Sequence, residues 1–303
     1  MIEVGSYFLH GERRVMKTRW FTPWLCILPA VILVTIFLAY PTVRTIQLSF
    51  YDRQGRNFVG LNNYWYIFRH KSTLLAIRNN LLWMTVFPSI SVILGLIVAI
   101  LADRVSYEKV IKGIVFMPMA ISFVGAGVIW KFVYAYKPKE VSQIGLLNAI
   151  VVACGGQPIA WLSQRPWINN LCLIIIGIWI WTGFCVVIFS AAYRNISKEI
   201  IEAARIDGAN EWQAFWRVIL PQLKPTIAAV MTTLMVFALK VFDIVYVTTN
   251  GLFDTEVLVN RMYKEMFLYH NVGRACAIAV VLFIASVLIL GYNIRSRFVR
   301  KGG

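Results

Sequence analysis

Residues 202–225 read EAARIDGANEWQAFWRVILPQLKP, and this stretch decides how the whole chain is interpreted. It is the longest polar and charge-dense segment in an otherwise very apolar sequence, and long apolar segments lie on both sides of it. Charged groups are costly inside a bilayer, so a polar connection of this kind belongs in water or at a membrane surface.

The residues around this stretch predict two short helices joined by a tight turn. Ser197 can cap the first helix, and Ala203 and Ala204 are strong helix formers with small side chains. Asp207-Gly208 is expected to break that helix, because glycine readily adopts the positive φ of a C-terminal turn.

The second predicted helix begins at Asn210, with a glutamine three residues later that completes a capping box. Its apolar stripe has helical spacing: Trp212, Phe215, Trp216 and Ile219. Pro221 and Pro225 are expected to end this helix and to begin the next membrane span. Periodicity alone fits equally well with an ordinary loop that packs on the rest of the protein.

The composition of the chain is that of a membrane protein. The chain has 303 residues, of which 59% are apolar, and a mean hydropathy of +0.68. Soluble domains average about 45–50% apolar residues. The net charge of +16 is not read as a nucleic-acid surface, because the cations are scattered between apolar spans, where loops flanking membrane helices favour them. We expect a lipid bilayer as partner and no nucleic acid.

Six apolar spans predict an all-α, polytopic membrane protein with six transmembrane helices. Each span is long enough to cross a bilayer, which takes about 20 residues. We place them at about 21–41, 80–102, 113–135, 168–192, 226–248 and 275–294.

The orientation follows from the loops. Cations are denser in the segments that lie inside if the N-terminus is cytoplasmic, as expected from the positive-inside rule. Residues 1–20 are then a cytoplasmic tail, residues 21–294 the membrane domain, and residues 295–303 a second cytoplasmic tail. The segment 197–225 also lies inside. The span at 21–41 is too long for a typical signal peptide and is interpreted as an uncleaved helix.

The motifs of an enzyme are missing from the sequence. There is no G-x-x-x-x-G-K followed by Ser or Thr, no H-E-x-x-H and no G-x-S-x-G. The five cysteines have neither the spacing of a disulfide framework nor that of a metal site. We therefore expect no catalytic residue, no metal and no cofactor on this chain, so energy has to come from a partner. A membrane enzyme is the disfavoured alternative.

Two charges fall inside the fifth predicted span. Lys240 and Asp243 are three residues apart, which places them on one face of a helix. Charges at that depth face a bundle interior or a water-filled path. Both a mutually neutralising pair and direct contacts with a transported solute fit this pattern.

The polar stretch resembles the coupling motif of the permease subunits of ABC importers, the segment that docks onto a separate ATPase. The matching residues are Glu202, Ala203, Ala204, Asp207, Gly208, Ala209, Phe215, Leu220, Pro221 and Pro225. Residues 58–64, 145–148 and 179–183 are similar to the MalF-type branch of carbohydrate permeases. Residues 239–245, 255–257, 260–262 and 292–295 look like α-glucoside permeases, including those for glucosylglycerol-type solutes.

The resemblance implies the type I ABC importer permease fold in a bacterial inner membrane, importing a carbohydrate by alternating access. It implies four kinds of partner: a second homologous permease, two ATP-binding subunits that carry ATP and Mg, a soluble substrate-binding protein, and lipid. Glu202, Ala203, Ala204, Asp207, Gly208, Ala209, Leu220 and Pro221 would couple to the ATPase.

The substrate pathway implied by the resemblance falls on Gly177, Trp181 and Phe184 in the fourth span, and on Phe237, Ala238 and Val241 in the fifth, with Lys240 and Asp243 added for their charge. The family's asparagine-type positions are Gly177, Ala238 and Val241 here, whose side chains cannot hydrogen-bond, so the partner permease is expected to carry more of the sugar binding. The alternative solute is an anion such as glycerol phosphate, which would favour an unpaired cation at Lys240.

Overall fold

A computed structural model describes residues 22–299, with side chains described for residues 24–291. The described chain is helical and contains an isolated bridge between Tyr51 and Phe58 but no strand. It divides into two units, residues 1–45 and residues 46–303. The all-α class predicted from the sequence is confirmed within the described residues.

The described part of the first unit is one long apolar helix that continues into the second unit. It comprises α1 (Thr22–Val34), a π-helical segment (Thr35–Ala39) and α2 (Tyr40–Leu48). The stretch Trp24–Leu48 has a mean hydropathy of 2.2 and is long enough to cross a membrane. The helix satisfies its own backbone groups, as any lipid-exposed segment must. It runs further than the predicted span at 21–41, and residues 1–20 lie outside the described residues.

The second unit holds the remaining elements. In chain order they are α3 (Asn62–Arg69), α4 (Lys71–Ala102), α5 (Glu108–Phe116), a 3-10 turn (Met117–Ala120), α6 (Phe123–Val133), α7 (Leu146–Ala153), a 3-10 turn (Trp161–Ser163), α8 (Ile168–Arg194), α9 (Lys198–Ile206), α10 (Glu211–Ala214), a π-helical segment (Phe215–Ile219), α11 (Leu220–Leu239), α12 (Asp243–Thr248), α13 (Leu258–Tyr263), a π-helical segment (Lys264–Leu268) and α14 (Val272–Val299).

The core of the second unit lies between α4, α8 and α11. Trp83 and Phe87 of α4, Phe189 of α8 and Leu234 of α11 are fully buried there. A Cβ added at Gly95 of α4 would lie 2.2 Å from the Cβ of Cys185 on α8. The missing side chain therefore lets the two helices approach closely, as small residues do in membrane bundles.

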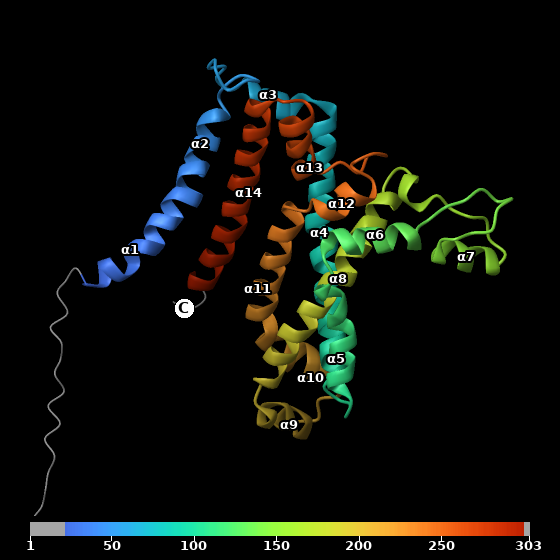
Figure 1. Cartoon of the computed structure of the whole chain (residues 1–303). Coiled ribbons are helices and arrows are strands. Elements are labelled where there is room, and N and C mark those ends of the chain that lie inside the picture. Colours follow the sequence, from blue (N-terminus) through green and yellow to red (C-terminus); the bar gives the residue numbers. More distant parts are fainter. Residues whose placement is uncertain (1–21, 300–303) are drawn as a thin grey trace, which may run out of the picture. The chain divides into compact units, whose positions relative to one another are not determined.

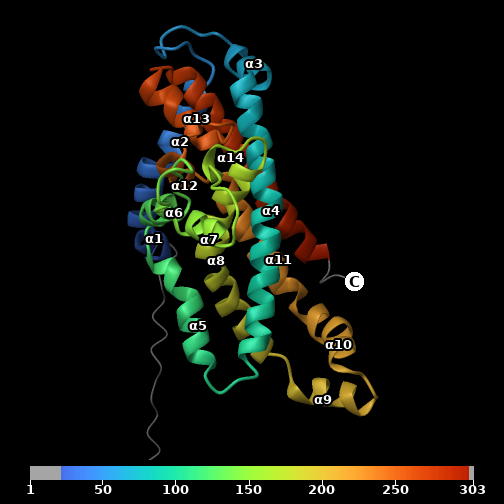
Figure 2. The same cartoon turned by 90° about the vertical axis from the view of Figure 1, so that its right-hand side faces the viewer.

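The two ends of the second unit differ in structure. α9 and α10 lie at one end, whereas α3 and α13 lie at the opposite end, as both views show (Figures 1 and 2). The long helices α4, α8 and α11 run between these ends. Elements at one end are therefore separated from those at the other by the length of these long helices.

The third predicted span, at 113–135, is broken rather than continuous. α5 with its 3-10 turn and α6 meet at an angle of 100°. Pro118 in the turn is buried and has no N–H to donate. The Ser122 side chain accepts a hydrogen bond from the N–H of Gly125, 3.0 Å away, and caps α6. A proline followed by an N-cap thus ends one helix and starts another inside an apolar stretch.

The fifth predicted span, at 226–248, is also interrupted. A continuous helix runs over Glu211–Leu239, and α12 begins only at Asp243 after a break in which Phe242 is not helical, with φ −140° and ψ −64°. The helices that could span a membrane number five, or six if the bent pair is one span, among the described residues. The predicted C-terminal tail at 295–303 continues α14 up to Val299, and residues 300–303 lie outside the described residues.

Candidate functional site

In the α9–α10 hairpin, residues 197–225, the turn after α9 and the start of α10 form as the local sequence predicts. Gly208 has φ +85° in the turn after α9, a conformation that side chains with a Cβ rarely adopt. The Asn210 side chain accepts from the N–H of Gln213, and the Gln213 side chain accepts from the N–H of Asn210. This capping box fixes where α10 begins. Ser197 lies at the N-cap of α9, but its hydroxyl donates to Glu199 instead of accepting from the helix.

The residues predicted to couple to an ATPase fall into two groups. Six lie on α9 and in its turn: Glu202, Ala203, Ala204, Asp207, Gly208 and Ala209. Four of these six are exposed, and Ala204 and Ala209 are half-buried. Leu220 and Pro221 lie instead in the first turn of α11, both half-buried. The turn of the hairpin thus presents small and acidic side chains to the surroundings.

The prediction that Pro221 and Pro225 end the second helix is wrong. Glu211–Leu239 is one helix in which the two prolines lie. Pro221 cannot donate to the carbonyl four residues before it, and the segment immediately before α11, Phe215–Ile219, is π-helical, which is a wider turn. The amphipathic part of the hairpin is therefore continuous with the long apolar helix.

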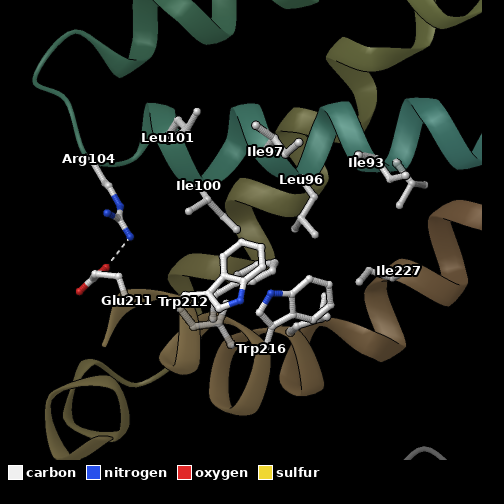
Figure 3. A pocket seen from close by; sticks show the side chains of 14 residues that line it. Ile93, Leu96, Ile97, Ile100, Leu101, Arg104, Glu211, Trp212, Trp216 and Ile227 are labelled. Atoms are coloured by element: carbon white, nitrogen blue, oxygen red, sulfur yellow. Dashed lines mark hydrogen bonds and ion pairs between the residues drawn. The ribbon is translucent and has the colours of Figure 1, made fainter. Parts of the chain in front are cut away.

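An apolar groove of about 560 Å³ lies between the start of this helix, residues 211–227, and the second half of α4, whereas the rest of α11 packs against α4. Figure 3 shows Trp212 and Trp216 on one side and Leu96, Ile97 and Ile100 on the other. Trp212 is 69% exposed, whereas Ile219 of the same predicted stripe is buried. All four residues of the stripe line the groove, so the stripe faces α4.

Two arginines hold the hairpin at one end of this groove. Glu211 accepts from Arg104, 2.6 Å away, in the connection after α4, and pairs with Arg205 of α9 at 2.7 Å. All three side chains are about half exposed, so each pair contributes little to stability. Their effect is geometric, because Glu211 links α9, α10 and the end of α4. The sequence contained no signal for this cluster, since Arg104 and Glu211 are 107 residues apart.

A second cluster forms where the two interrupted spans meet. α6 packs against α12, and aromatic rings from several helices gather beside them. The ring centroids of Trp181 and Phe237 are 4.8 Å apart, and those of Trp181 and Phe184 are 5.4 Å apart. Phe123 at the start of α6 stacks on Trp181 at 6.5 Å, and Phe87 of α4 lies 5.5 Å from Phe237.

The structure thus brings together three predicted pathway residues, Trp181, Phe184 and Phe237, and adds Phe87 and Phe123. The indole N–H of Trp181 has no hydrogen-bond partner within the described chain. Phe123 is not among the predicted residues, because the helix break that positions it was not predicted. Proline followed by a serine cap, at 118 and 122, was the available signal.

Three other predicted pathway residues are core residues in this chain. Gly177 is buried, and a Cβ there would come within 3.0 Å of Trp83. Ala238 and Val241 are buried as well, with 0% and 2% of their surfaces exposed. In the structure of this chain they form packing contacts and do not line an open path.

Lys240 and Asp243 are not on one helix face. α11 ends at Leu239 and α12 begins at Asp243, so the two residues flank the break between these helices. Lys240 is exposed and Asp243 is half-buried. Within residues 22–299 no ion pair joins them. The interpretation as a mutually neutralising pair is therefore wrong for this structure, because the non-helical Phe242 interrupts the helix between the two residues.

The break itself is held by Asn80 of α4, which is buried. Its amide nitrogen donates to the carbonyls of Ala238 and Leu239, 3.2 and 3.1 Å away. Its amide oxygen accepts from the N–H of Leu258, 2.8 Å away, at the start of α13. The last carbonyls of a helix have no partner within it, so Asn80 satisfies them where α11 ends.

Because Lys240 and Asp243 do not pair, we expect their substitutions to act independently. In a cycle of Lys240→Gln, Asp243→Asn and the double variant, the coupling free energy should stay below about 0.5 kcal/mol. The measurement is the unfolding free energy of each purified variant.

The control cycle for this prediction uses Lys264→Gln and Glu256→Gln. Those side chains form an ion pair at 2.7 Å, and contacting charges couple by about 0.5–3 kcal/mol. A double variant at Lys240 and Asp243 that is more stable than either single variant would restore the ion-pair interpretation.

Among the described residues no three His, Cys, Asp or Glu side chains come together in a way that could hold a metal ion.

A helical bundle with two interrupted spans and an amphipathic hairpin at one end defines a membrane transport protein, because broken helices mark solute sites in transporters. Residues 91–301 match the model of the family described as "binding-protein-dependent transport system inner membrane component", and the chain belongs to that family.

Two relatives are similar over nearly the whole chain. The osmoprotective compounds uptake permease protein GgtC of Synechocystis sp. is 54% identical over 267 residues, which are 88% of this chain and 95% of that protein. The α-glucoside transport system permease protein AglF of Rhizobium meliloti is 50% identical over 300 residues, which are 99% of this chain and 89% of that protein.

A solved structure shares the fold. It is the crystal structure of a bacterial ABC transporter involved in the import of the acidic polysaccharide alginate. One of its chains has a TM-score of 0.79 and is 22% identical, with 90% of this chain and 94% of that chain covered. The predicted ABC importer permease fold is therefore confirmed.

Proposed function

We propose that this permease imports an α-glucoside, a disaccharide or a glucosylglycerol-like solute, by ATP-driven alternating access. The observation that carries the proposal is the aromatic cluster of the half-buried Trp181, Phe184, Phe237 and Phe123 beside the two helix breaks, with the fully buried Phe87 packed against Phe237. Aromatic faces suit the apolar face of a sugar ring, and the unpartnered N–H of Trp181 is a donor for a hydroxyl. The names of the relatives GgtC and AglF point to the same class of solute.

A second candidate solute is an anion such as glycerol phosphate. It is favoured by one observation, the exposed ammonium group of Lys240, which has no carboxylate partner within the described chain. The aromatic cluster does not support this candidate, since its rings offer no cation. We therefore rank the neutral sugar first.

The partners are proposed from the family and from the hairpin. A second, homologous permease would complete the pathway, and two subunits carrying ATP and Mg would bind the exposed turn at residues 202–209. A soluble substrate-binding protein would deliver the solute at the opposite end of the bundle. Closure of the ATPases would push the hairpin, and the continuous helix Glu211–Leu239 would transmit that movement to the aromatic cluster.

Uptake of a panel of labelled solutes by cells with and without this chain tests the proposal. The panel contains α-linked disaccharides, glucosylglycerol and glycerol phosphate. We expect uptake of an α-glucoside to depend on the chain and to be outcompeted by other α-glucosides only. If glycerol phosphate is the one solute whose uptake depends on the chain, the second candidate is accepted in place of the sugar.

The proposed orientation places both termini and the hairpin in the cytoplasm of a bacterial inner membrane. We expect an impermeant thiol reagent to label Ile206→Cys, which is 86% exposed in α9, from the cytoplasmic side only. Gln54→Cys, exposed at the opposite end, should be labelled from the periplasmic side only. The background needs replacement of Cys26 and Cys154, because the other cysteines are buried. The reverse pattern would invert the topology.

A further inference from the structure

A polar pocket of about 380 Å³ lies at the end of the bundle opposite the α9–α10 hairpin. We call it the arginine pocket. The lining residues that matter here are Arg53, Tyr66, Arg261, Glu265, Tyr269 and Arg274. They come from the loop after α2, from α3, from α13 with its π-helical extension, and from α14. The aromatic cluster and the coupling residues are not part of it.

The pocket is built on a fixed frame. Arg53 donates to the carbonyls of Tyr269 and His270, 2.6 and 3.4 Å away, and its own carbonyl accepts from the N–H of Val272. The guanidinium of Arg274 lies 3.7 Å from the centre of the Tyr66 ring. These contacts hold the loop after α2 against the start of α14 and fix the walls of the pocket.

A buried ion pair lines the pocket, and two of its polar atoms have no hydrogen-bond partner among the described residues. Arg261 pairs with Glu265 and donates to the Tyr66 hydroxyl, 2.7 Å away. Burial raises the pKa of Tyr66, which therefore stays protonated. Arg261 and Glu265 are only 8% and 1% exposed, yet Nε of Arg261 and Oε2 of Glu265 have no hydrogen-bond partner among the described residues. Buried groups left in that state are costly. Nε of Arg261 is a donor and matches a bound acceptor, whereas Oε2 of Glu265 is itself an acceptor and gains nothing from a bound carboxylate.

The pocket has an excess of positive charge. It contains three guanidinium groups and one carboxylate. Within the described residues Arg53 and Arg274 have no carboxylate at ion-pair distance. A planar carboxylate matches the fork of an arginine. A phosphate dianion fits less well, because Glu265 would repel two charges more strongly than one.

We propose that the arginine pocket binds a carboxylate, supplied by an acidic side chain of the soluble binding protein. The proposal rests on the proposed function, which places that protein at this end of the bundle. Arg53 and Tyr269 are exposed at the rim, so a side chain can enter from the aqueous side. Charge complementarity of this kind sets docking register and association rate.

Arginine modification tests the pocket without any partner. The assembled transporter in lipid nanodiscs is treated with phenylglyoxal, in sodium acetate or in sodium chloride at equal ionic strength, and modified peptides are quantified. Acetate should slow modification of Arg53 and Arg274 at least about threefold relative to chloride. Arg56, exposed in the same loop, should react equally in both salts. Equal reaction of all three arginines in both salts would overturn the proposal.

Binding measurements then identify the source of the carboxylate. Arg53→Gln and Arg274→Gln should weaken binding of the soluble binding protein to the transporter at least about tenfold at low salt. Arg56→Gln removes the same charge nearby and should change it less than about twofold. Arg274→Lys, which keeps the charge, should restore part of the affinity.

Two further outcomes are distinguishable. If acetate protects the arginines but both glutamine variants bind the binding protein normally, the pocket takes a free carboxylate and the docking proposal is overturned. If the unmodified transporter binds no binding protein and imports nothing, the proposed function has failed. The acetate experiment remains valid in that case, because it uses neither transport nor the partner.

Discussion

Gly208→Pro should reduce solute uptake about a hundredfold while the protein still inserts into the membrane. Gly208 has φ +85° and donates its N–H to the carbonyl of Arg205, 3.0 Å away. Proline fixes φ near −65° and has no N–H, at a cost of about 3 kcal/mol or more. That is about a hundredfold in an equilibrium. The measurements are uptake, the amount of protein in the membrane, and binding of the ATPase subunits.

Gly155→Pro is a matched control for this prediction. Gly155 has φ +82°, donates its N–H to Val152, 2.9 Å away, and has open space around the position of a Cβ, as Gly208 has. It follows α7, outside the hairpin. The backbone strain is the same in both variants, so a selective loss of uptake at Gly208 reports on coupling. Equal uptake in the two variants would remove the hairpin from the mechanism.

Asn80→Leu should be among the most destabilising single changes in the chain. The variant keeps a similar volume but removes the side-chain partner of the Leu239 carbonyl and of the Leu258 N–H at the break after α11, whereas the Ala238 carbonyl keeps the N–H of Val241. Each such group costs about 1–3 kcal/mol. We expect a loss of about 3 kcal/mol or more, seen as a midpoint of thermal unfolding lowered by roughly 5 °C or more.

Two further variants show whether hydrogen bonding is the cause. Asn80→Asp keeps the shape and the acceptor for Leu258, but it places a carboxylate against the two carbonyls at a helix C-terminus, which repels it. It should be destabilised as well. Asn62→Leu makes the same chemical change at an exposed position and should stay within about 0.5 kcal/mol of the parent. A stable Asn80→Asp would mean that Asn80 only fills space.

The hairpin was predictable because its signals are local. Gly208 and the capping box of Asn210 and Gln213 act within a few residues, and the structure has each of them in its predicted role. The proline prediction failed for an equally physical reason. A π-helical turn before Pro221 absorbs the missing hydrogen bond, so the helix continues.

The interrupted spans were not predictable from hydropathy. Hydropathy measures how apolar a window of sequence is, and it does not report the direction in which a helix runs. Pro118 and Ser122 carried a local signal for the first break. The second break depends on Asn80, which is more than 150 residues away from the carbonyls it caps. For the same reason the pairing of Glu211 with Arg104 and the arginine pocket appear only when distant segments are brought together.

The central claim is that ATP on the hairpin side drives uptake of an α-glucoside through the aromatic cluster. The most direct measurement is accumulation of a labelled α-glucoside by proteoliposomes that contain the assembled complex, with binding protein on one side and ATP on the other. We predict accumulation that requires both and that is abolished by Gly208→Pro. Accumulation at the same rate without ATP, or chemical conversion of the glucoside by the isolated chain, would contradict the claim.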